Sequence, residues 1–417
     1  MKFSLPAFCL LCLAGFSVAR AQEGRNPADE IITDFGIDEY LAVPQWTLSI
    51  GAQSLSGAKA SFSGHGLVSS FQPPSDITTP NILRTYHDGT VYPDASPVTF
   101  TYSNSDGTTT TYVGPITPAG QTNNWAFLSS RMVREDGNLD FHSYTATVDN
   151  PGTLQPDVPR GYGIEINLER DLGKLTKNIE WKLVFGGSLN DIKAHTSTLL
   201  NSTVTTIADT YYVNLNGQTM PVAPPAYSAP HTIQVGRVDA DGNPVLDGKG
   251  NQYIDYQDAS VLLGNVPLGR TTTVINNGIV AGDWLLKGAY FSFRAGPKFC
   301  YRITDRLRFT LGAGLALIYA GTQYTVVQVY IPQDADSVFA LADEDESKLL
   351  VGYYVDATLQ YDFTDRAGFY AGAVYQTGDS YTETASLSDR NGSTGAYKAL
   401  VDLSSLQGFR MGMCFKF

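Results

Sequence analysis

The sequence has 417 residues, of which 43% are hydrophobic, 12% aromatic and 17% charged, and its formal net charge is −13. This composition excludes a disordered, collagenous or coiled-coil chain, and the acidic balance disfavours a nucleic-acid partner because phosphate groups are bound by basic stripes. The charged fraction is well below the ~25% of an average soluble domain, and Tyr (24) and Phe (20) are abundant, which favours aromatic-rich β structure.

The first segment of the chain, residues 1–21, has the pattern of a secretory signal peptide. Lys2 precedes an apolar stretch over residues 8–18, and residues 19–21 (Ala-Arg-Ala) have the form of a cleavage site. The stretch is shorter than the ~20 apolar residues of a membrane-spanning helix, which argues against an anchor. We expect residues 22–45 to form an N-terminal segment and residues 46–417 to form the folded body.

Two-residue alternation of side-chain polarity is sharpest in the last third of the chain. Over residues 349–363 the odd positions are apolar and the even positions are mostly polar or small, and the same division recurs over residues 289–303 and 307–319. These runs are longer than the ~5–6 residues of a typical soluble strand and long enough to cross a bilayer at about 45° tilt. We therefore interpret them as strands of a transmembrane antiparallel β-barrel, with the apolar face toward lipid and the polar face toward the interior.

Short turns and long connections alternate along the chain. Residues 301–306 (YRITDR) and 361–366 (YDFTDR) are near-copies, and a third short turn is expected at residues 171–174. The long connections are expected over the four ranges 55–160, 191–283, 331–348 and 384–404. This asymmetry is typical of outer-membrane barrels, which have short periplasmic turns and long extracellular loops.

The strands between these connections number eight, and ten or twelve are possible if parts of the first two connections enter the wall. The same two connections are expected to hold β-hairpins of their own, over residues 98–112 and 125–148, as extracellular extensions. The predicted strands are Trp46–Ser54, Tyr162–Arg170, Ile179–Leu189, Trp284–Ile303, Leu307–Val326, Leu349–Phe363, Ala367–Tyr381 and Leu406–Phe417.

The last residues alternate large apolar side chains with polar or small ones and finish on an aromatic residue. The apolar positions are Phe409, Met411, Met413, Phe415 and Phe417. This ending resembles the last strand of Gram-negative outer-membrane β-barrels, where it is the signal read by the barrel-assembly machinery. With the Thr-Asp turns, the chain resembles the small opacity-like and OmpA-type barrel families. The resemblance implies a place in the cell outer membrane, among outer-membrane lipid and lipopolysaccharide, and is uninformative about activity.

The polar faces of the predicted strands place charged side chains in the barrel interior. An eight-stranded barrel is just wide enough for its own side chains to fill, so we expect these charges to interlock as ion pairs. A narrow, slightly anion-preferring pore is the alternative, and it requires more strands. The expected interior charges are Glu165, Glu169, Glu180, Asp356 and Asp362 against Lys182, Arg294, Lys298, Arg302, Arg308, Arg410 and Lys416.

No pattern in the sequence predicts catalysis. All five histidines fall in predicted connections, and no Ser/His or Asp/His pair lies on a predicted strand, although Ser143 follows His142. Residues 239–243 (DADGN) are similar to a calcium loop, but Pro244 stands where that loop needs Gly and Gly250 where it needs an acid. We expect neither a cofactor nor a metal site.

Four further side chains bear on the architecture. Cys300 and Cys414 are expected on opposite walls of the ring, so both are predicted to be free thiols. Trp181 and Trp284 suit interfacial girdles, and equally an ordinary core.

The sequence therefore predicts a non-enzymatic outer-membrane barrel with a structural role or a role in surface interactions through its large outer loops. A small-solute channel is the first alternative, and a membrane-embedded hydrolase is the second.

Overall fold

The computed structural model describes residues 46–94, 99–103, 109–113, 117–221, 227–228, 232–258, 260–333, 335–388 and 394–417. The expected signal peptide at residues 1–21 and the expected segment at residues 22–45 lie outside the described residues. Residues 44–417 form one compact unit, and its described part is all-β apart from the short 3-10 helix η3 (Ser130–Met132). Within these ranges no helix is long and apolar enough to span a membrane.

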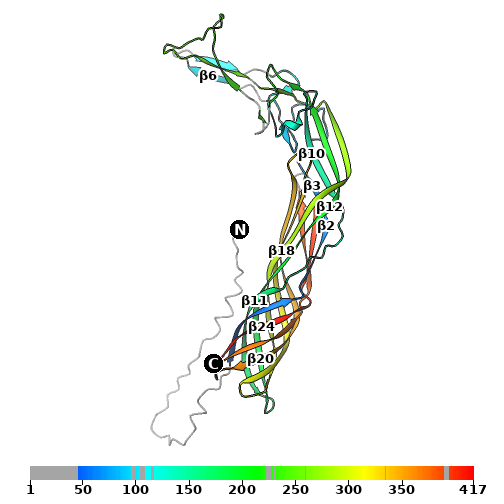
Figure 1. Ribbon diagram of the computed structural model, residues 1–417, viewed down its shortest axis with the longest axis vertical. Helices are drawn as coiled ribbons and strands as arrows, with labels where there is room; N and C mark the ends of the chain where they lie inside the picture. Colours follow the sequence, from blue (N-terminus) through cyan, green and yellow to red (C-terminus); the bar gives the residue numbers. More distant parts are fainter. Residues whose placement is uncertain are drawn as a thin grey trace. The chain divides into compact units, whose positions relative to one another are not determined.

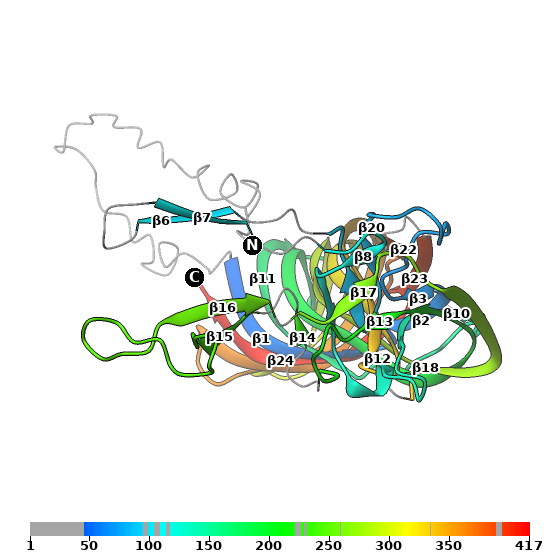
Figure 2. The same cartoon turned by 90° about the horizontal axis from the view of Figure 1, so that it is seen from above.

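A ten-stranded antiparallel sheet forms the body of the chain, and eight of its strands close into a ring (Figure 1). The ring closes because β11 pairs with both β1 and β12. Seen from above in Figure 2, β11, β1 and β24 curve side by side. The strands in sheet order are β11 (Gly161–Lys174), β1 (Trp46–Ser56), β24 (Leu406–Lys416), β21 (Ala367–Gln376), β20 (Val338–Asp362), β19 (Leu307–Tyr330), β18 (Gly269–Arg302), β12 (Ile179–Tyr211), β10 (Leu139–Val148) and β3 (Leu67–Ser69).

Four strands of the ring continue well beyond it. β12 has 33 residues, β18 has 34, β19 has 24 and β20 has 25. A three-stranded sheet of β2 (Lys59–His65), β23 (Thr394–Asp402) and β22 (Ser380–Ser388) packs against this continuation. We call the continuation, together with the sheets packed on it, the extension.

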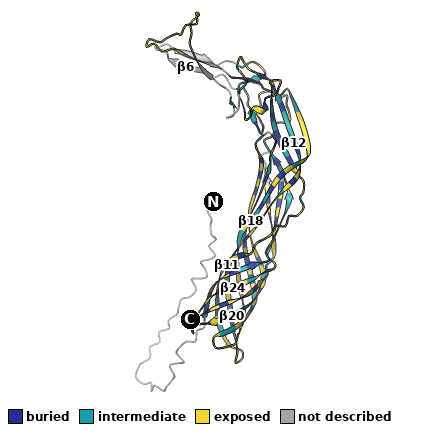
Figure 3. Cartoon of the chain, in the orientation of Figure 1, coloured by how far each residue is buried: buried dark blue, intermediate teal, exposed yellow. Residues whose placement is uncertain are grey.

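The polarity of both strand faces reverses where the ring meets the extension. The boundary is a row of directly paired, outward-facing residues, namely Leu189, Phe291, Tyr319 and Leu349. On the short-turn side of this row, outward positions are apolar and inward positions are mostly polar or small. Beyond the row, β12 turns Ile192 and Ala194 inward and buries them, while Asp191 and Lys193 face outward and are exposed. Figure 3 shows the alternation of buried and exposed residues continuing along β12 and β18.

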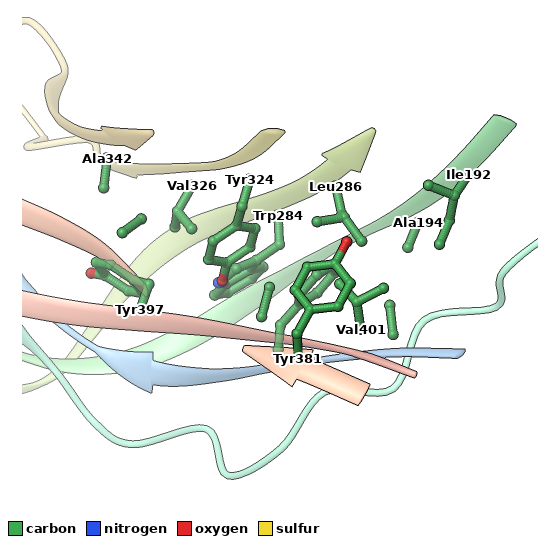
Figure 4. Close-up of a cluster of buried hydrophobic side chains, with 14 of the residues drawn as sticks. Ile192, Ala194, Trp284, Leu286, Tyr324, Val326, Ala342, Tyr381, Tyr397 and Val401 are labelled. Atoms are coloured by element: carbon green, nitrogen blue, oxygen red, sulfur yellow. The ribbon is translucent and has the colours of Figure 1, made fainter. Parts of the chain in front are cut away.

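The inward side chains of the extension form an apolar core between the two sheets. Trp284 on β18 and Tyr324 on β19 are fully buried and face Tyr381 and Val401 of the opposite sheet (Figure 4). Trp284 is thus a core residue, not part of an interfacial girdle. Burial of apolar side chains stabilises a core by about 1.5–3 kcal/mol for each large residue, so the extension is held by the hydrophobic effect.

The expected small eight-stranded barrel with long loops is wrong. Eight strands close the ring, but the sheet has ten, and much of three expected connections is strand. β12 continues to Tyr211 and β18 begins at Gly269, within the connection expected at residues 191–283. Likewise, residues 338–348 belong to β20, while β22 and β23 lie over residues 380–388 and 394–402. Next to the boundary row the outward residues of these strands are mostly polar or small, so the strands lack the continuous lipid-facing pattern that identifies a membrane strand.

The remaining strands form small sheets. β6 (Thr99–Ser103) and β7 (Thr109–Val113) pair as the hairpin expected over residues 98–112. The hairpin expected over residues 125–148 is wrong, because β9 (Trp125–Phe127) pairs with β5 and β14 while β10 pairs with β12 and β3. The other short strands are β4 (Arg84–Thr85), β5 (Gly89–Val91), β8 (Gln121–Thr122), β13 (Val213–Asn214), β14 (Tyr227–Ser228), β15 (Thr232–Gly236), β16 (Ile254–Asp258) and β17 (Leu262–Gly264).

Candidate functional site

The ring interior contains a cluster of charged side chains that come from four strands. Glu165 of β11 accepts hydrogen bonds from Arg294 Nη2 of β18 at 2.7 Å and from Arg410 Nε of β24 at 2.9 Å. The second arm of Arg410 reaches Asp356 Oδ2 of β20 at 2.9 Å, and the Tyr370 hydroxyl donates to Glu165 at 2.7 Å. Two carboxylates and two guanidinium groups thereby balance one another across the ring.

A second cluster lies closer to the short turns. Lys298 Nζ donates to Glu169 Oε1 at 2.6 Å, and Lys182 Nζ is 3.7 Å from the other oxygen of the same carboxylate. All three side chains are buried. Glu169 therefore holds β11, β12 and β18 together from the inside.

The third cluster forms a chain of ion pairs at the short-turn rim. Arg302 and Arg308 both contact Glu180, at 2.7 and 3.4 Å. Arg308 also lies 3.3 Å from Asp362, which forms a second ion pair with Lys416 at 2.6 Å. The structure therefore places all of the interior charges that the sequence identifies in ion pairs with one another.

The ring interior is occupied by these side chains. Glu165 is 1% exposed and Arg410 is 5% exposed, and the charges are used in contacts within the ring. Removing one partner would leave a buried charge without compensation, which is strongly destabilising. The arrangement therefore favours a closed, rigid wall over a charged passage for solutes.

The C-terminal apolar positions lie on the outer surface of the ring. β24 pairs with β1 and β21, and the backbones of Trp46 and Phe417 exchange two hydrogen bonds. All five side chains are exposed, so the whole apolar face of the last strand points away from the interior: Phe409, Met411, Met413, Phe415 and Phe417.

A cavity of about 890 Å³ lies in the extension, where it is lined by residues of β10, β12 and β18 and by the end of β19. Its polar lining includes Asp88, Arg131, Asp140 and His142, and its apolar lining includes Tyr144 and Tyr330. This combination of charged and aromatic groups suits a polar ligand with one flat or apolar face.

The cavity contains a His–Asp pair. His142 Nδ1 lies 2.7 Å from Asp88 Oδ2, and the backbone N–H of His142 donates to Asp88 Oδ1, also at 2.7 Å. Two contacts from one carboxylate fix the orientation of the imidazole ring. Ser143, the next residue on β10, is fully buried and no hydrogen bond to the His142 ring is seen, so the adjacent pair does not form a Ser/His dyad.

The expectation that all histidines lie in connections is wrong. His65, His142 and His195 lie on β2, β10 and β12, whereas His231 lies outside the described residues. His195 also pairs with an acid, Asp283 of β18, at 2.9 Å on the exposed outer face. Asp88 and His142 are 54 positions apart in the sequence, so the His142–Asp88 pair could not have been recognised without knowledge of the fold.

A buried polar clasp holds the segment that carries Asp88. Arg270 donates to both oxygens of Asp209 at 2.7 Å, and the Tyr86 hydroxyl donates to Asp209 at 2.6 Å. Burial, with the neighbouring Tyr211 and Asp209, raises the pKa of the Tyr86 hydroxyl well above its usual range. The hydroxyl therefore stays a hydrogen-bond donor, and it fixes β4, β12 and β18 relative to one another beside the cavity.

Glu383 is a buried acid in the apolar core of the extension. The Thr322 hydroxyl donates to one of its carboxylate oxygens, and the other oxygen has no hydrogen-bond partner among the described residues. Burial raises the pKa of Glu383 to about 7, and the nearby Glu346, Asp345 and Glu344 act in the same direction. The sequence does not point to this residue, because Glu383 falls between the predicted strand that ends at Tyr381 and the connection expected over residues 384–404, where no core is expected.

Cysteines 300 and 414 are both buried and free. In the part of the chain that the structure describes, no group of three or more His, Cys, Asp and Glu side chains is arranged to hold a metal ion. Asp239 is the first acid of the segment that is similar to a calcium loop. It accepts hydrogen bonds from the backbone N–H groups of Asp241 and Asn243 within its own turn.

No family model matches the chain, and no curated protein is significantly similar to it. The opacity-like or OmpA-type resemblance is therefore not supported by these comparisons. Among solved structures, the outer-membrane protease OmpT of Escherichia coli is similar at 10% identity over 90% of this chain and 98% of that one, with a TM-score of 0.25.

Two further structures are similar at the same low level. A FadL homologue of Pseudomonas aeruginosa has 11% identity over 89% of this chain and 90% of that one, and the P. putida toluene transporter TodX has 7% identity over 92% and 94%. Both TM-scores are 0.17. All three are outer-membrane β-barrel proteins. TM-scores this low do not assign a function to this chain.

Proposed function

We propose that the chain is an integral outer-membrane β-barrel protein, non-enzymatic, whose ring is a sealed anchor and whose extension binds a partner outside the membrane. The observation that carries this proposal is the reversal of side-chain polarity at the row Leu189, Phe291, Tyr319 and Leu349. A sheet that is apolar outside and charged inside suits surrounding lipid, whereas the opposite arrangement suits surrounding water.

The dimensions of the apolar band support a bilayer. β19 has 13 residues from Leu307 to the boundary residue Tyr319. At ~3.3 Å per residue and about 45° tilt, these span roughly 28 Å, close to the ~25 Å apolar band of an outer-membrane barrel. The terminal Phe417 and the apolar residues of β24 fit recognition by the barrel-assembly machinery, and outer-membrane lipid and lipopolysaccharide are the proposed surroundings.

Side chains fill the interior of both the ring and the extension, which argues against a channel. Ion pairs occupy the ring, and Trp284, Tyr324 and their neighbours occupy the extension. A solute would have to displace both, at the cost of breaking buried ion pairs. The cavity beside Asp88 and His142 is the proposed recess for this partner.

Three measurements on the refolded protein test this proposal. We expect slower or faster gel migration of the unheated protein than of the boiled protein, stable insertion into phosphatidylcholine vesicles, and no conductance steps in planar bilayers. A protein that stays folded and soluble without detergent would contradict the membrane assignment. Regular conductance steps would contradict the sealed anchor and favour the channel.

The His142–Asp88 pair supports a second candidate function, a hydrolase. An imidazole oriented by a carboxylate can act as a general base toward water or a hydroxyl group. A test is lipid and peptide hydrolysis by the refolded protein, with His142→Ala as the variant and His195→Ala as the matched control, because His195 also pairs with an acid but lies outside the cavity. Turnover lost only in His142→Ala would replace the non-enzymatic proposal.

A further inference from the structure

The outer wall of the ring has an apolar groove directly below the boundary row. Its volume is about 700 Å³, and it extends over β11, β12, β18, β19 and β20. Small residues interrupt the apolar face in the groove: Gly187 on β12 lies between Phe185 and Leu189, and Ala295 on β18 lies next to Phe293. A Cβ added to Gly187 would meet no atom within 4 Å, so this position is open space.

Two lysines lie just beyond the boundary on the same outward face. Lys193 of β12 and Lys287 of β18 are directly paired across the strands, and both are exposed. Neither forms an ion pair with any residue that the structure describes. Like charges directly opposite each other on a sheet are destabilising, so this pair gains from a bound anion.

The lysines are within reach of the groove. Lys193 follows Leu189 by four residues, which is ~13 Å along the strand and about 10 Å in height when the strand is tilted by ~40°. A lysine side chain can extend toward the interface over apolar surface, which brings its ammonium group down to the upper end of the groove.

The acids near the lysine pair have other partners or lie two strands from Lys287, where Asp345 of β20 stands opposite Gln323. Asp191, between Lys193 and the groove, accepts a hydrogen bond from the backbone N–H of Tyr162 at 2.6 Å. Farther along the strand, His195 pairs with Asp283. The cross-strand neighbour of Lys287 on its other side is the uncharged Gln323. In a chain of net charge −13, two adjacent unpaired lysines form a local exception.

We propose that Lys193 and Lys287 clamp the phosphomonoester of an acylated glycolipid of the outer leaflet, with one acyl chain lying in the groove. A phosphomonoester carries about −1.5 to −2 charges near pH 7, which matches two ammonium groups, whereas the phosphodiester of a phospholipid carries one charge. The inference rests on the proposed function, because only a membrane-spanning ring exposes the groove to acyl chains.

The test measures the thermal shift of the refolded protein in neutral detergent on addition of bisphosphorylated lipid A. We expect lipid A to raise the melting temperature, and dephosphorylated lipid A and phosphatidylglycerol to raise it much less. Replacing both lysines (Lys193→Gln with Lys287→Gln) should weaken the apparent affinity by roughly 20-fold or more, since each basic residue near a membrane surface contributes about a fivefold factor. Gly187→Leu, which fills the groove, should also weaken it.

The matched control is Lys174→Gln with Lys177→Gln, which removes the same charge at the short-turn rim. This control should keep the full affinity, and Lys193→Arg with Lys287→Arg should keep most of it, which covers the case that the Gln variant folds poorly. Equal loss in the control, equal effects of phosphatidylglycerol and lipid A, or no shift at all would each overturn the proposal. Insertion into phosphatidylcholine vesicles separates the two claims: insertion without a lipid A effect overturns only the clamp, and failure to insert overturns the proposed function itself.

Discussion

The ring and the extension share four long strands, yet they bury opposite kinds of side chain. In the ring, Arg410 and Glu165 meet in the interior and Leu315 faces outward with 70% of its surface exposed. In the extension, Tyr324 is fully buried and Lys193 faces outward. The backbone ladder is the same in both parts, so the surrounding solvent, and not the strand geometry, decides which face carries which residues.

The two cores also differ in how they stabilise the chain. Each buried side chain of an apolar core stabilises the folded state. In a buried ion pair, by contrast, the attraction between the charges roughly offsets the cost of removing both from water. The ring charges are therefore expected to specify which strands meet and in what register, more than to add net stability. Removing one member of an ion pair should nevertheless be costly, because its partner is left buried.

The largest expected effect comes from Arg410→Ala in the ring. Arg410 contacts both Glu165 and Asp356, so its loss leaves two buried carboxylates without one of their cations. We expect the free energy of unfolding in detergent or vesicles to fall by about 3–5 kcal/mol. Equilibrium urea unfolding measures this loss of stability. The control is Arg302→Ala, because the Arg302 side chain lies at the short-turn rim and is 40% exposed. A loss below about 1 kcal/mol for Arg410→Ala would mean that the interior is hydrated.

The next effect contrasts two outward positions on one strand. Leu315→Lys puts a charge in the apolar band, and Thr325→Lys puts the same charge on the same face of β19 beyond the boundary row. The first should destabilise the vesicle-inserted protein by about 2–4 kcal/mol, and the second should change its stability by less than about 0.5 kcal/mol. Equal costs for the two variants, measured by unfolding from vesicles, would remove the membrane boundary from its assigned row.

The sequence predicts strand faces well and strand partners poorly. Alternation over residues 349–363 is a local property, so it identifies the outward and inward faces of the ring without knowledge of the fold. It also selects Arg294 and Glu165 as interior charges, but these residues are 129 positions apart, and which acid meets which base depends on register. Alternation alone does not contain that information.

The same local rule explains why the sequence does not predict the strands of the extension or the His142–Asp88 pair. Beyond residue 190 the alternation continues with reversed sign, so a search for lipid-facing apolar residues classifies it as loop. The His142–Asp88 pair depends in addition on β10 joining the sheet outside the ring and on a clasp around Asp209, neither of which has a sequence motif. A search for alternation of either sign would have extended β12 from Asp191 to Ala194 and β18 back to Asp283, whereas residues 269–279 show no such alternation.

A pH-dependent effect is expected in the core of the extension. The pKa of Glu383 is about 7 in the folded protein, above its ordinary value of 4.5, so the folded state binds the proton more tightly than the unfolded state. Stability is then greatest below pH 4.5, falls between pH 4.5 and 7, and stays lower above pH 7, as far as this residue decides it.

Glu383→Gln removes that dependence. At pH 8 the variant should be more stable than the original protein by about 2 kcal/mol, and the difference should vanish near pH 4. Unfolding curves recorded from pH 4 to 8 measure it, with Glu135→Gln, an exposed acid in the turn before β10, as the control. A variant that is less stable than the original protein at pH 8 would show that the carboxylate is ionised and compensated in the core.

The smallest expected effect isolates burial as the cause of the difference between the two parts. His195 and Asp283 on the outer face of the extension are 2.9 Å apart, the same separation as Arg410 and Glu165 in the ring, but the side chains of both are about half exposed. Water already solvates each group, so His195→Gln should change the free energy of unfolding by no more than about 0.5 kcal/mol. Denaturant unfolding of His195→Gln beside Arg410→Ala under the same conditions measures the difference. If His195→Gln costs as much as Arg410→Ala, then contact distance and not desolvation governs the ion pairs of this sheet, and the reversal of polarity at the boundary would need a different physical explanation.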